Sequence, residues 1–118
     1  SDTLLYRLVF NLVENAIRYS RPGSTVNVSI CDNDSHVFLR VEDQGPGIPK
    51  QYRESIFQPF FRLDKSRSRA YGGAGLGLAL VWEIAALHGG TVEVETSSEN
   101  GTTMLVSLPK RSVALTEQ

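Results

Sequence analysis

Two asparagines one helical turn apart, Asn11 and Asn15, carry the first chemical signal in this sequence. They lie within residues 3–19, where apolar residues recur at helical spacing, and they share the face opposite the apolar stripe with Glu14 and Arg18. Glu14 and Arg18 are four residues apart, which equally suits a solvated ion pair that stabilises the helix. Asparagine costs helix propensity and gains nothing from solvent, so the asparagine pair favours a role in binding a ligand or a metal.

A second signal is Asp43, an acidic residue at the predicted end of a strand, followed by Gly45 and Gly47. Glycines let a ligand approach the backbone closely. A buried carboxylate beside such a loop can accept a hydrogen bond from an exocyclic amine such as that of adenine. The same residues also suit an ordinary aspartate-containing turn, and this segment alone does not separate the two interpretations.

A third group of residues, Gly73, Gly75 and Gly77, leads directly into an apolar segment of helical periodicity. A helix N-terminus presents unsatisfied N–H groups and the positive end of the helix dipole, which suits a phosphate. The spacing is neither the dinucleotide-binding fingerprint nor a P-loop, because no Gly-Lys-Ser/Thr follows. These glycines therefore indicate an anion site of another type.

Between these signals lie an aromatic segment and a basic one. We expect the aromatics of residues 56–61 to belong mainly to the core and to anchor a hinge. Residues 62–73 are polar and basic, and we expect them to form a mobile lid. A solvated loop or a clamp on terminal phosphates would account equally for the cations of this segment, which are Arg62, Lys65, Arg67 and Arg69.

The elements that must position these groups follow from hydrophobic periodicity and turn residues. Their order predicts an α/β sandwich, with a mixed, mostly antiparallel sheet covered on one face by helices. We expect one domain over residues 1–109 and a tail over residues 110–118. The predicted elements are a helix at 3–19, strands at 25–31 and 37–43, a short helix at 51–57, a helix at 76–87, and strands at 91–96 and 103–108.

Composition limits the possible partners and compartments. The 118 residues are 41% hydrophobic and carry a net charge of −1, so nucleic acid and anionic membranes are poor partners. The single cysteine, Cys31, favours a reducing compartment. No apolar run reaches the ~20 residues that span a bilayer, and residues 1–2 do not open a signal peptide. The start at Ser1 suggests a piece of a longer protein.

Taken together and in order, the blocks closely resemble the ATP-binding catalytic domain of sensor histidine kinases, a Bergerat fold of the GHKL superfamily. The resemblance covers almost the whole chain. It rests on the segments that the family calls the N, G1, F and G2 boxes, which stand here as 11–15, 43–47, 57–61 and 73–77. The final hairpin of the family is matched by the glycine and threonines at 101–103 and by the closing Leu108 and Pro109.

The resemblance implies roles for individual residues. Asn15 would coordinate Mg²⁺, Asp43 would bind the adenine amine, and Thr102 would support Asp43 through water. Asn11, Asn15 and Arg62 would act at the reacting phosphates as catalytic residues. The implied ATP-binding set is Asn11, Asn15, Arg18, Tyr19, Asp43, Gly45, Gly47, Ile48, Phe60, Arg62, Lys65, Arg69, Gly73, Gly75, Leu76, Gly77, Leu78 and Thr102.

The resemblance also implies the reaction and its partners. The γ-phosphate of Mg–ATP would pass to a histidine on a separate dimerisation and phosphoacceptor domain of the same parent protein, as the first step of two-component signalling. A response regulator would be an indirect partner, the parent would be a homodimer, and this part would be a monomer in the cytoplasm beneath an inner-membrane sensor. Arg18 stands where the family usually has lysine, and Gln44 where it often has asparagine.

Two other functions compete with this one. An ATP hydrolase resembling type II topoisomerases, the ninety-kilodalton chaperone or mismatch-repair proteins would carry a glutamate at position 11 to activate water, whereas Asn11 cannot take a proton. A regulatory module without catalysis would be expected to lose Asn15, Asp43 or a glycine of the third group, and all are present. We expect His36 and His88 to be structural or surface histidines, so the acceptor histidine lies elsewhere.

Overall fold

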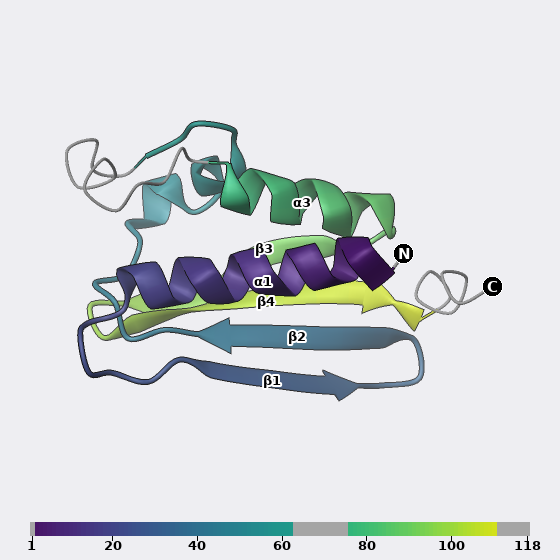
Figure 1. Ribbon diagram of the computed structural model, residues 1–118, viewed down its shortest axis with the longest axis horizontal. Coiled ribbons are helices and arrows are strands. Elements are labelled where there is room, and N and C mark those ends of the chain that lie inside the picture. Colours follow the sequence, from purple (N-terminus) through teal and green to yellow (C-terminus); the bar gives the residue numbers. More distant parts are fainter. Residues whose placement is uncertain (1, 63–75, 111–118) are drawn as a thin grey trace.

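The computed structural model describes residues 2–62 and 76–110. Its elements, in order, are α1 (Asp2–Tyr19), β1 (Asn27–Asp32), β2 (His36–Glu42), the 3-10 turns η1 (Lys50–Tyr52) and η2 (Ser55–Phe57), α3 (Gly77–Leu87), β3 (Thr91–Ser98) and β4 (Gly101–Pro109). The strands form one sheet in the order β1-β2-β4-β3, and every pairing is antiparallel. The two helices lie side by side on one face of this sheet (Figure 1). The predicted sandwich is confirmed, with a fully antiparallel sheet in the described strands.

The core forms between the helices and the sheet. Leu8, Leu12 and Ala16 recur every four residues on α1 and are buried, and Val81, Ile84 and Ala85 are their counterparts on α3. Alternate residues of the strands point at the helices. Complete burial of one such leucine stabilises the fold by about 2 kcal/mol. The inward strand residues are Leu39, Val41, Val92, Met104, Val106 and Leu108.

The predicted apolar stripe of the first helix is wider than the buried one. Val9 is 37% exposed and Ile17 is 62% exposed. The helix packs on the sheet and against α3 on one flank, and within the described residues nothing covers its other flank. Within the part described, no helix is long and apolar enough to cross a membrane.

Two further predictions need correction. Residues 51–57 form two short 3-10 turns instead of one helix. The hydrogen bonds here join residues three apart, as from the N–H of Tyr52 to Pro49 and from the N–H of Gln58 to Ser55, and such bonding rarely extends far. The second strand of the last hairpin is longer than expected, since pairing begins at Gly101. Of the predicted tail, residues 111–118 lie outside the described residues.

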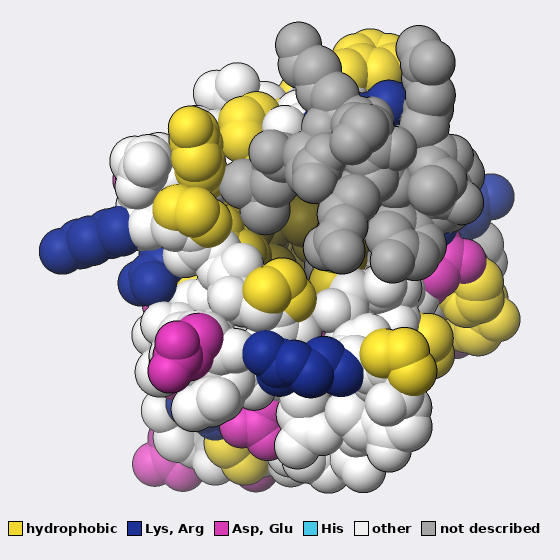
Figure 2. Space-filling view, turned by 90° about the vertical axis from the view of Figure 1, so that its left-hand side faces the viewer, with side chains coloured by type: hydrophobic (Ala, Val, Ile, Leu, Met, Phe, Trp, Pro, Cys, Tyr) yellow, Lys and Arg dark blue, Asp and Glu magenta, His cyan; other side chains and the backbone are white. Residues whose placement is uncertain are grey.

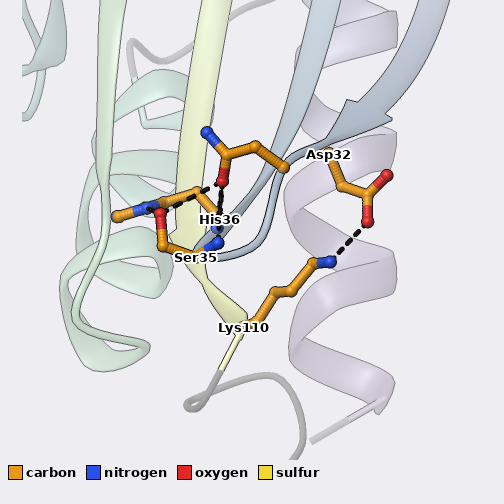
Figure 3. A network of polar contacts seen from close by, with 5 residues as sticks. Asp32, Ser35, His36 and Lys110 are labelled. Carbon is orange, nitrogen blue, oxygen red and sulfur yellow. Dashed lines mark hydrogen bonds and ion pairs between the residues drawn. The ribbon is translucent and has the colours of Figure 1, made fainter.

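The turn between β1 and β2 is held by short polar contacts at the end of the sheet where α1 begins (Figure 3). The side-chain oxygen of Asn33 accepts hydrogen bonds from the backbone N–H groups of Ser35 and His36, both at 2.8 Å. Lys110, just after β4, forms an ion pair with Asp32. The segment that follows β4 is therefore linked to the β1–β2 hairpin.

Candidate functional site

The end of the sheet opposite that turn holds Asp43, directly after β2, with only 7% of the residue exposed. Its Oδ1 accepts hydrogen bonds from the backbone N–H groups of Gly45 at 2.9 Å and Thr102 at 3.1 Å. In the described part of the chain both bonds go to Oδ1, so Oδ2 remains available to a ligand. Burial raises the pKa of this carboxyl group, and the two amide hydrogen bonds partly oppose that shift.

The glycines that follow Asp43 are required by close packing and by backbone conformation. A β-carbon at Gly45 would clash with the carbonyl group of Tyr19, the last residue of α1. Gly47 has a φ of +86°, and a β-carbon there would clash with a backbone carbonyl of β3. The loop after β2 is therefore pressed against both the end of α1 and the last hairpin.

Polar side chains that carried no recognisable signal fasten this loop. Arg21 donates to the carbonyl oxygens of Gln44 at 2.8 Å and Glu99 at 2.6 Å. The hydroxyl of Ser20 accepts from the N–H of Gln44 at 3.0 Å. These residues belong to no motif, and their partners are 23 or more residues away in the chain for each bond. Sequence reasoning therefore missed them.

On α1, the predicted asparagines, Asn11 and Asn15, are half-buried, and Asn11 lies beside α3. A β-carbon at Gly77 of α3 would lie 3.2 Å from the Asn11 Oδ1. The predicted position opposite the core is thus wrong for Asn11, because the first residue of α3 lies against its side chain. Asn11 donates to the carbonyl oxygen of Arg7 at 2.8 Å, while the side chain of Asn15 makes no hydrogen bond among the described residues.

The other two polar residues of this helix form the expected ion pair. Arg18 lies 3.6 Å from Glu14, in the i, i+4 arrangement, and the Glu14 side chain is 49% exposed. Such an exposed pair contributes about 0.5 kcal/mol or less. The weakness of the pair leaves Arg18 able to turn toward an anion.

The N-terminus of α3 faces the same end of the molecule. The helix begins at Gly77, and among the described residues no side-chain hydrogen bond caps its first amide groups. Leu76, the residue before it, is 47% exposed, and Leu78 is half-buried against the core. The uncapped amides next to Asn11 form a suitable cradle for phosphate.

The aromatic segment divides into buried and exposed members. Phe57 is buried, and its ring lies 5.5 Å from that of Trp82 on α3. Phe60, by contrast, is 69% exposed and has a φ of +67°, which is unusual for a bulky residue. The expectation of a core position is therefore confirmed for Phe57 and wrong for Phe60. Arg62 is half-buried, and four predicted site residues lie outside the described residues: Lys65, Arg69, Gly73 and Gly75.

The predicted groups from α1, the β2 loop, α3 and the β3–β4 turn meet at one end of the molecule (Figure 1). Figure 2 looks onto this end, where hydrophobic side chains are visible near the centre and Lys or Arg side chains stand at several places around them. The arrangement suits a ligand with an apolar ring at one end and negative charge at the other.

A separate hollow of about 230 Å³ lies on the uncovered face of the sheet, between Asn27, Arg40, Glu42 and Glu95. Arg40 donates to both carboxylate oxygens of Glu95, at 2.8 and 2.9 Å, and this bond lowers the pKa of Glu95. The charges of Arg40 and Glu95 neutralise each other. Among the described residues the Glu42 carboxylate accepts only the amide of Asn27, at 3.2 Å, so the hollow is a poor site for an anion such as phosphate.

A metal at the predicted site would depend on amide oxygens and on the nucleotide. Among the described residues no group of three or more histidine, cysteine or acidic side chains could hold a metal ion. Mg²⁺ needs only one or two protein ligands when phosphates and water supply the others. The half-buried Asn15, without a hydrogen-bond partner in the described chain, fits that requirement.

Comparison with known proteins shows which family this chain belongs to. Residues 1–112 match the family described as histidine kinase-, DNA gyrase B-, and HSP90-like ATPase, HATPase_c. The chain belongs to this family. The predicted identification as a histidine kinase catalytic domain is confirmed by its relatives among sensor kinases.

The relatives agree in sequence and in fold. The sensor protein RstB of Escherichia coli is 48% identical over 106 residues, which cover 90% of this chain and 24% of RstB. The sensor-like histidine kinase SenX3 of Mycobacterium tuberculosis is 46% identical over 108 residues, covering 92% of this chain and 26% of SenX3. The chain therefore spans about a quarter of the length of these curated relatives.

Two solved structures share the fold of this HATPase_c domain. The mycobacterial sensor histidine kinase MprB is 37% identical, with a TM-score of 0.80, over 92% of this chain and 72% of that one. Full-length ShkA in complex with AMPPNP is 31% identical, with a TM-score of 0.77, over 90% of this chain and 21% of ShkA. The roles of individual residues at the site stay predictions.

Proposed function

We propose that this domain binds Mg–ATP and delivers its γ-phosphate to a histidine on a separate dimeric helical domain of a parent sensor kinase. The observation that carries the proposal is Asp43, a buried carboxylate whose Oδ1 is occupied by two backbone amides and whose Oδ2 is left for an adenine amine. The complex of ShkA with AMPPNP, an ATP analogue, supports a nucleotide as the ligand of the family fold.

The positions of both histidines support an acceptor on another domain. His36 opens β2 at the end of the sheet opposite Asp43, and its Nδ1 lies 2.7 Å from the hydroxyl of Ser35 (Figure 3). His88 is buried at the C-terminal end of α3, with its Nδ1 2.8 Å from the carbonyl oxygen of Ile84. Neither histidine is therefore placed to receive a phosphoryl group bound near the start of α3. Because the sequence holds only these two histidines, the acceptor belongs to another domain.

In the proposed mechanism the protein positions the nucleotide and neutralises charge. Asp43 and Ile48 hold the base, while the free amides of α3 and Asn11 hold the phosphates. Asn15 would hold Mg²⁺, which supplies positive charge to the phosphates when bound. Arg18 and Arg62 add cations from the two sides of the site, and Lys65 and Arg69 are proposed to join them. A neutral imidazole is already a nucleophile, so the domain needs no general base of its own.

ATP hydrolysis is the competing activity, and the side chains at the site argue against it. The family hydrolases need a base near the phosphates, and the position expected for it holds Asn11, whose amide bonds to its own helix. Glu14 is the acidic residue next to Asn15 on this helix, but it is exposed and paired with Arg18. We further propose a cytoplasmic place beneath a membrane sensor, with a response regulator as the downstream partner.

Titration with ATP and with GTP, each with and without Mg²⁺, tests this function. We expect ATP to bind more tightly than GTP, because guanine presents a carbonyl oxygen where adenine presents the amine that Asp43 accepts. We also expect Mg²⁺ to strengthen binding. Equal affinity for GTP and ATP would contradict the role of Asp43, and no nucleotide binding at all would overturn the proposal.

A further inference from the structure

The loop that follows Asp43 is held through the backbone N–H and the backbone carbonyl oxygen of one residue, Ile48. Its N–H donates to the hydroxyl of Ser97 at 2.8 Å, and its carbonyl oxygen accepts from the Nε of Arg53 at 3.1 Å. Arg53 also donates to the carbonyl oxygen of Ser97 at 3.2 Å. Ser97 and Arg53 therefore fix the position of the Ile48 backbone relative to the last hairpin.

The same hydroxyl reaches the residue that holds Asp43. The Oγ of Ser97 lies 2.8 Å from the Oγ1 of Thr102, and the N–H of Thr102 donates to Asp43. A chain of hydrogen bonds thus runs from Ile48 through Ser97 and Thr102 to the buried carboxylate. Ser97 belongs to none of the segments that predicted the site.

A β-bulge directs Ser97 toward this site. Val92 and Val94 pair with Val106 and Met104 on the face under the helices, and the register then shifts between Val94 and Thr96. After one extra residue, Ser97 pairs with Thr102 on that same face. In a regular strand the alternation would have put Ser97 on the uncovered face.

The hydrogen-bond capacity of the hydroxyl sets its role. A serine hydroxyl has one hydrogen to donate and can accept from others. Ser97 accepts the N–H of Ile48 and shares a second hydrogen bond with Thr102, in which either hydroxyl can donate. When Ser97 donates in this bond, the hydrogen of the Thr102 hydroxyl is left for a ligand. Thr102 is 3% exposed, so its hydroxyl has little access to water as a hydrogen-bond partner.

We infer that Ser97 is a positioning residue for the base of the bound nucleotide, acting through Ile48 and Thr102. The inference rests on the proposed ATP binding and adds a specificity role that lies outside the four boxes. Its consequence is that Ser97 strengthens the preference for adenine that Asp43 provides, although its own side chain does not contact Asp43.

The experiment compares Ser97→Ala, Ser97→Thr and the neighbouring control Ser98→Ala in the full chain. In the described residues, the hydroxyl of Ser98 accepts only the N–H of Asn100 within the exposed turn, at 3.1 Å. Calorimetry gives the dissociation constants for ATP and GTP, and thermal unfolding without ligand gives stability. We expect Ser97→Ala to weaken ATP about tenfold and to reduce the ATP-to-GTP preference, as loss of a buried hydrogen bond predicts. Ser97→Thr should restore both values, and Ser98→Ala should match the unchanged chain.

The outcomes separate the inference from the function. An unchanged ATP-to-GTP preference in Ser97→Ala would overturn the inference, since a purely structural role lowers stability without changing the preference, while the proposed function would stand. Failure of the unchanged chain to bind ATP would overturn both. If Ser97→Ala does not fold, Ser97→Cys takes its place, because a thiol of similar size is a much weaker hydrogen-bond donor and acceptor. An unchanged preference in that variant would also overturn the inference.

Discussion

At the scale of single residues, Asp43 combines a cost to stability with a proposed gain in binding. Its pKa is raised mainly because burial disfavours the charged form. A raised pKa means that the folded chain holds the proton more tightly than the unfolded chain does. The stability that this group contributes is therefore full below its ordinary pKa of about 3.9, and it is lost as the pH rises through the raised pKa.

We predict that Asp43→Asn keeps or raises the free energy of unfolding at pH 7, because the amide oxygen can still accept from Gly45 and Thr102 without a buried charge. This advantage should vanish as the pH approaches 4. The variant should bind ATP about 30-fold more weakly, since its amide would oppose the adenine amine, a loss of about 2 kcal/mol. Urea unfolding at several pH values and ATP calorimetry measure both effects. A lower stability at pH 7 would show that the charged form is not disfavoured.

Asn15 offers a second test at this scale. Its side chain makes no hydrogen bond in the described chain, and alanine is the better helix former, so Asn15→Ala should fold at least as stably. We predict that the ratio of ATP affinities with and without Mg²⁺ falls toward one, because a lost amide ligand has no neighbour to replace it. Asn27→Ala, on the uncovered face of the sheet, is the matched control. If Asn15→Ala keeps the full effect of Mg²⁺, the asparagine is not a metal ligand.

At the scale of elements, the contact between Gly45 and the end of α1 sets how the helix meets the sheet. We predict that Gly45→Ala lowers the free energy of unfolding by about 3 kcal/mol, because its β-carbon would clash with the backbone of Tyr19. Gly23→Ala is the control, since Gly23 has a φ of +81° but nothing within 4 Å of the added carbon. It should cost only about 1 kcal/mol. Similar losses in the two variants would show that the clash is relieved by movement of the helix.

The order and type of most elements were predictable because hydrophobic periodicity is local. What the sequence could not show depends on contacts between distant segments. The β-bulge that redirects Ser97 interrupts the simple alternation of β3. The strand was therefore predicted to end at residue 96, two residues before its actual end. Val9 and Ile17 fit the periodicity of the core, yet no described element packs on their side of α1. The pairing of Asp43 with Thr102, 59 residues apart, could be foreseen only through family resemblance.

At the scale of the whole molecule, the distance of both histidines from the site predicts a dependence on a partner domain. The chain alone should bind ATP, hydrolyse it poorly and incorporate no acid-labile phosphate. Adding the parent's dimeric histidine domain should give slow transfer to that domain, because separation removes the effective concentration that a linker provides. Radiolabelled ATP and gel autoradiography measure this transfer. Steady hydrolysis by the chain alone would favour the ATPase alternative, with Glu14 as the candidate base.

The position of β4 also matters while the protein is being made. This strand is the last of the sheet along the chain, yet it lies between β2 and β3 at the centre. On the ribosome, the β1–β2 hairpin can form early, but β2 has no second neighbour and Asp43 lacks its Thr102 amide until β4 emerges. Incomplete translation products would thus expose the inner face of the sheet and lack the proposed adenine site, so they would be open to proteolysis before they could sequester nucleotide.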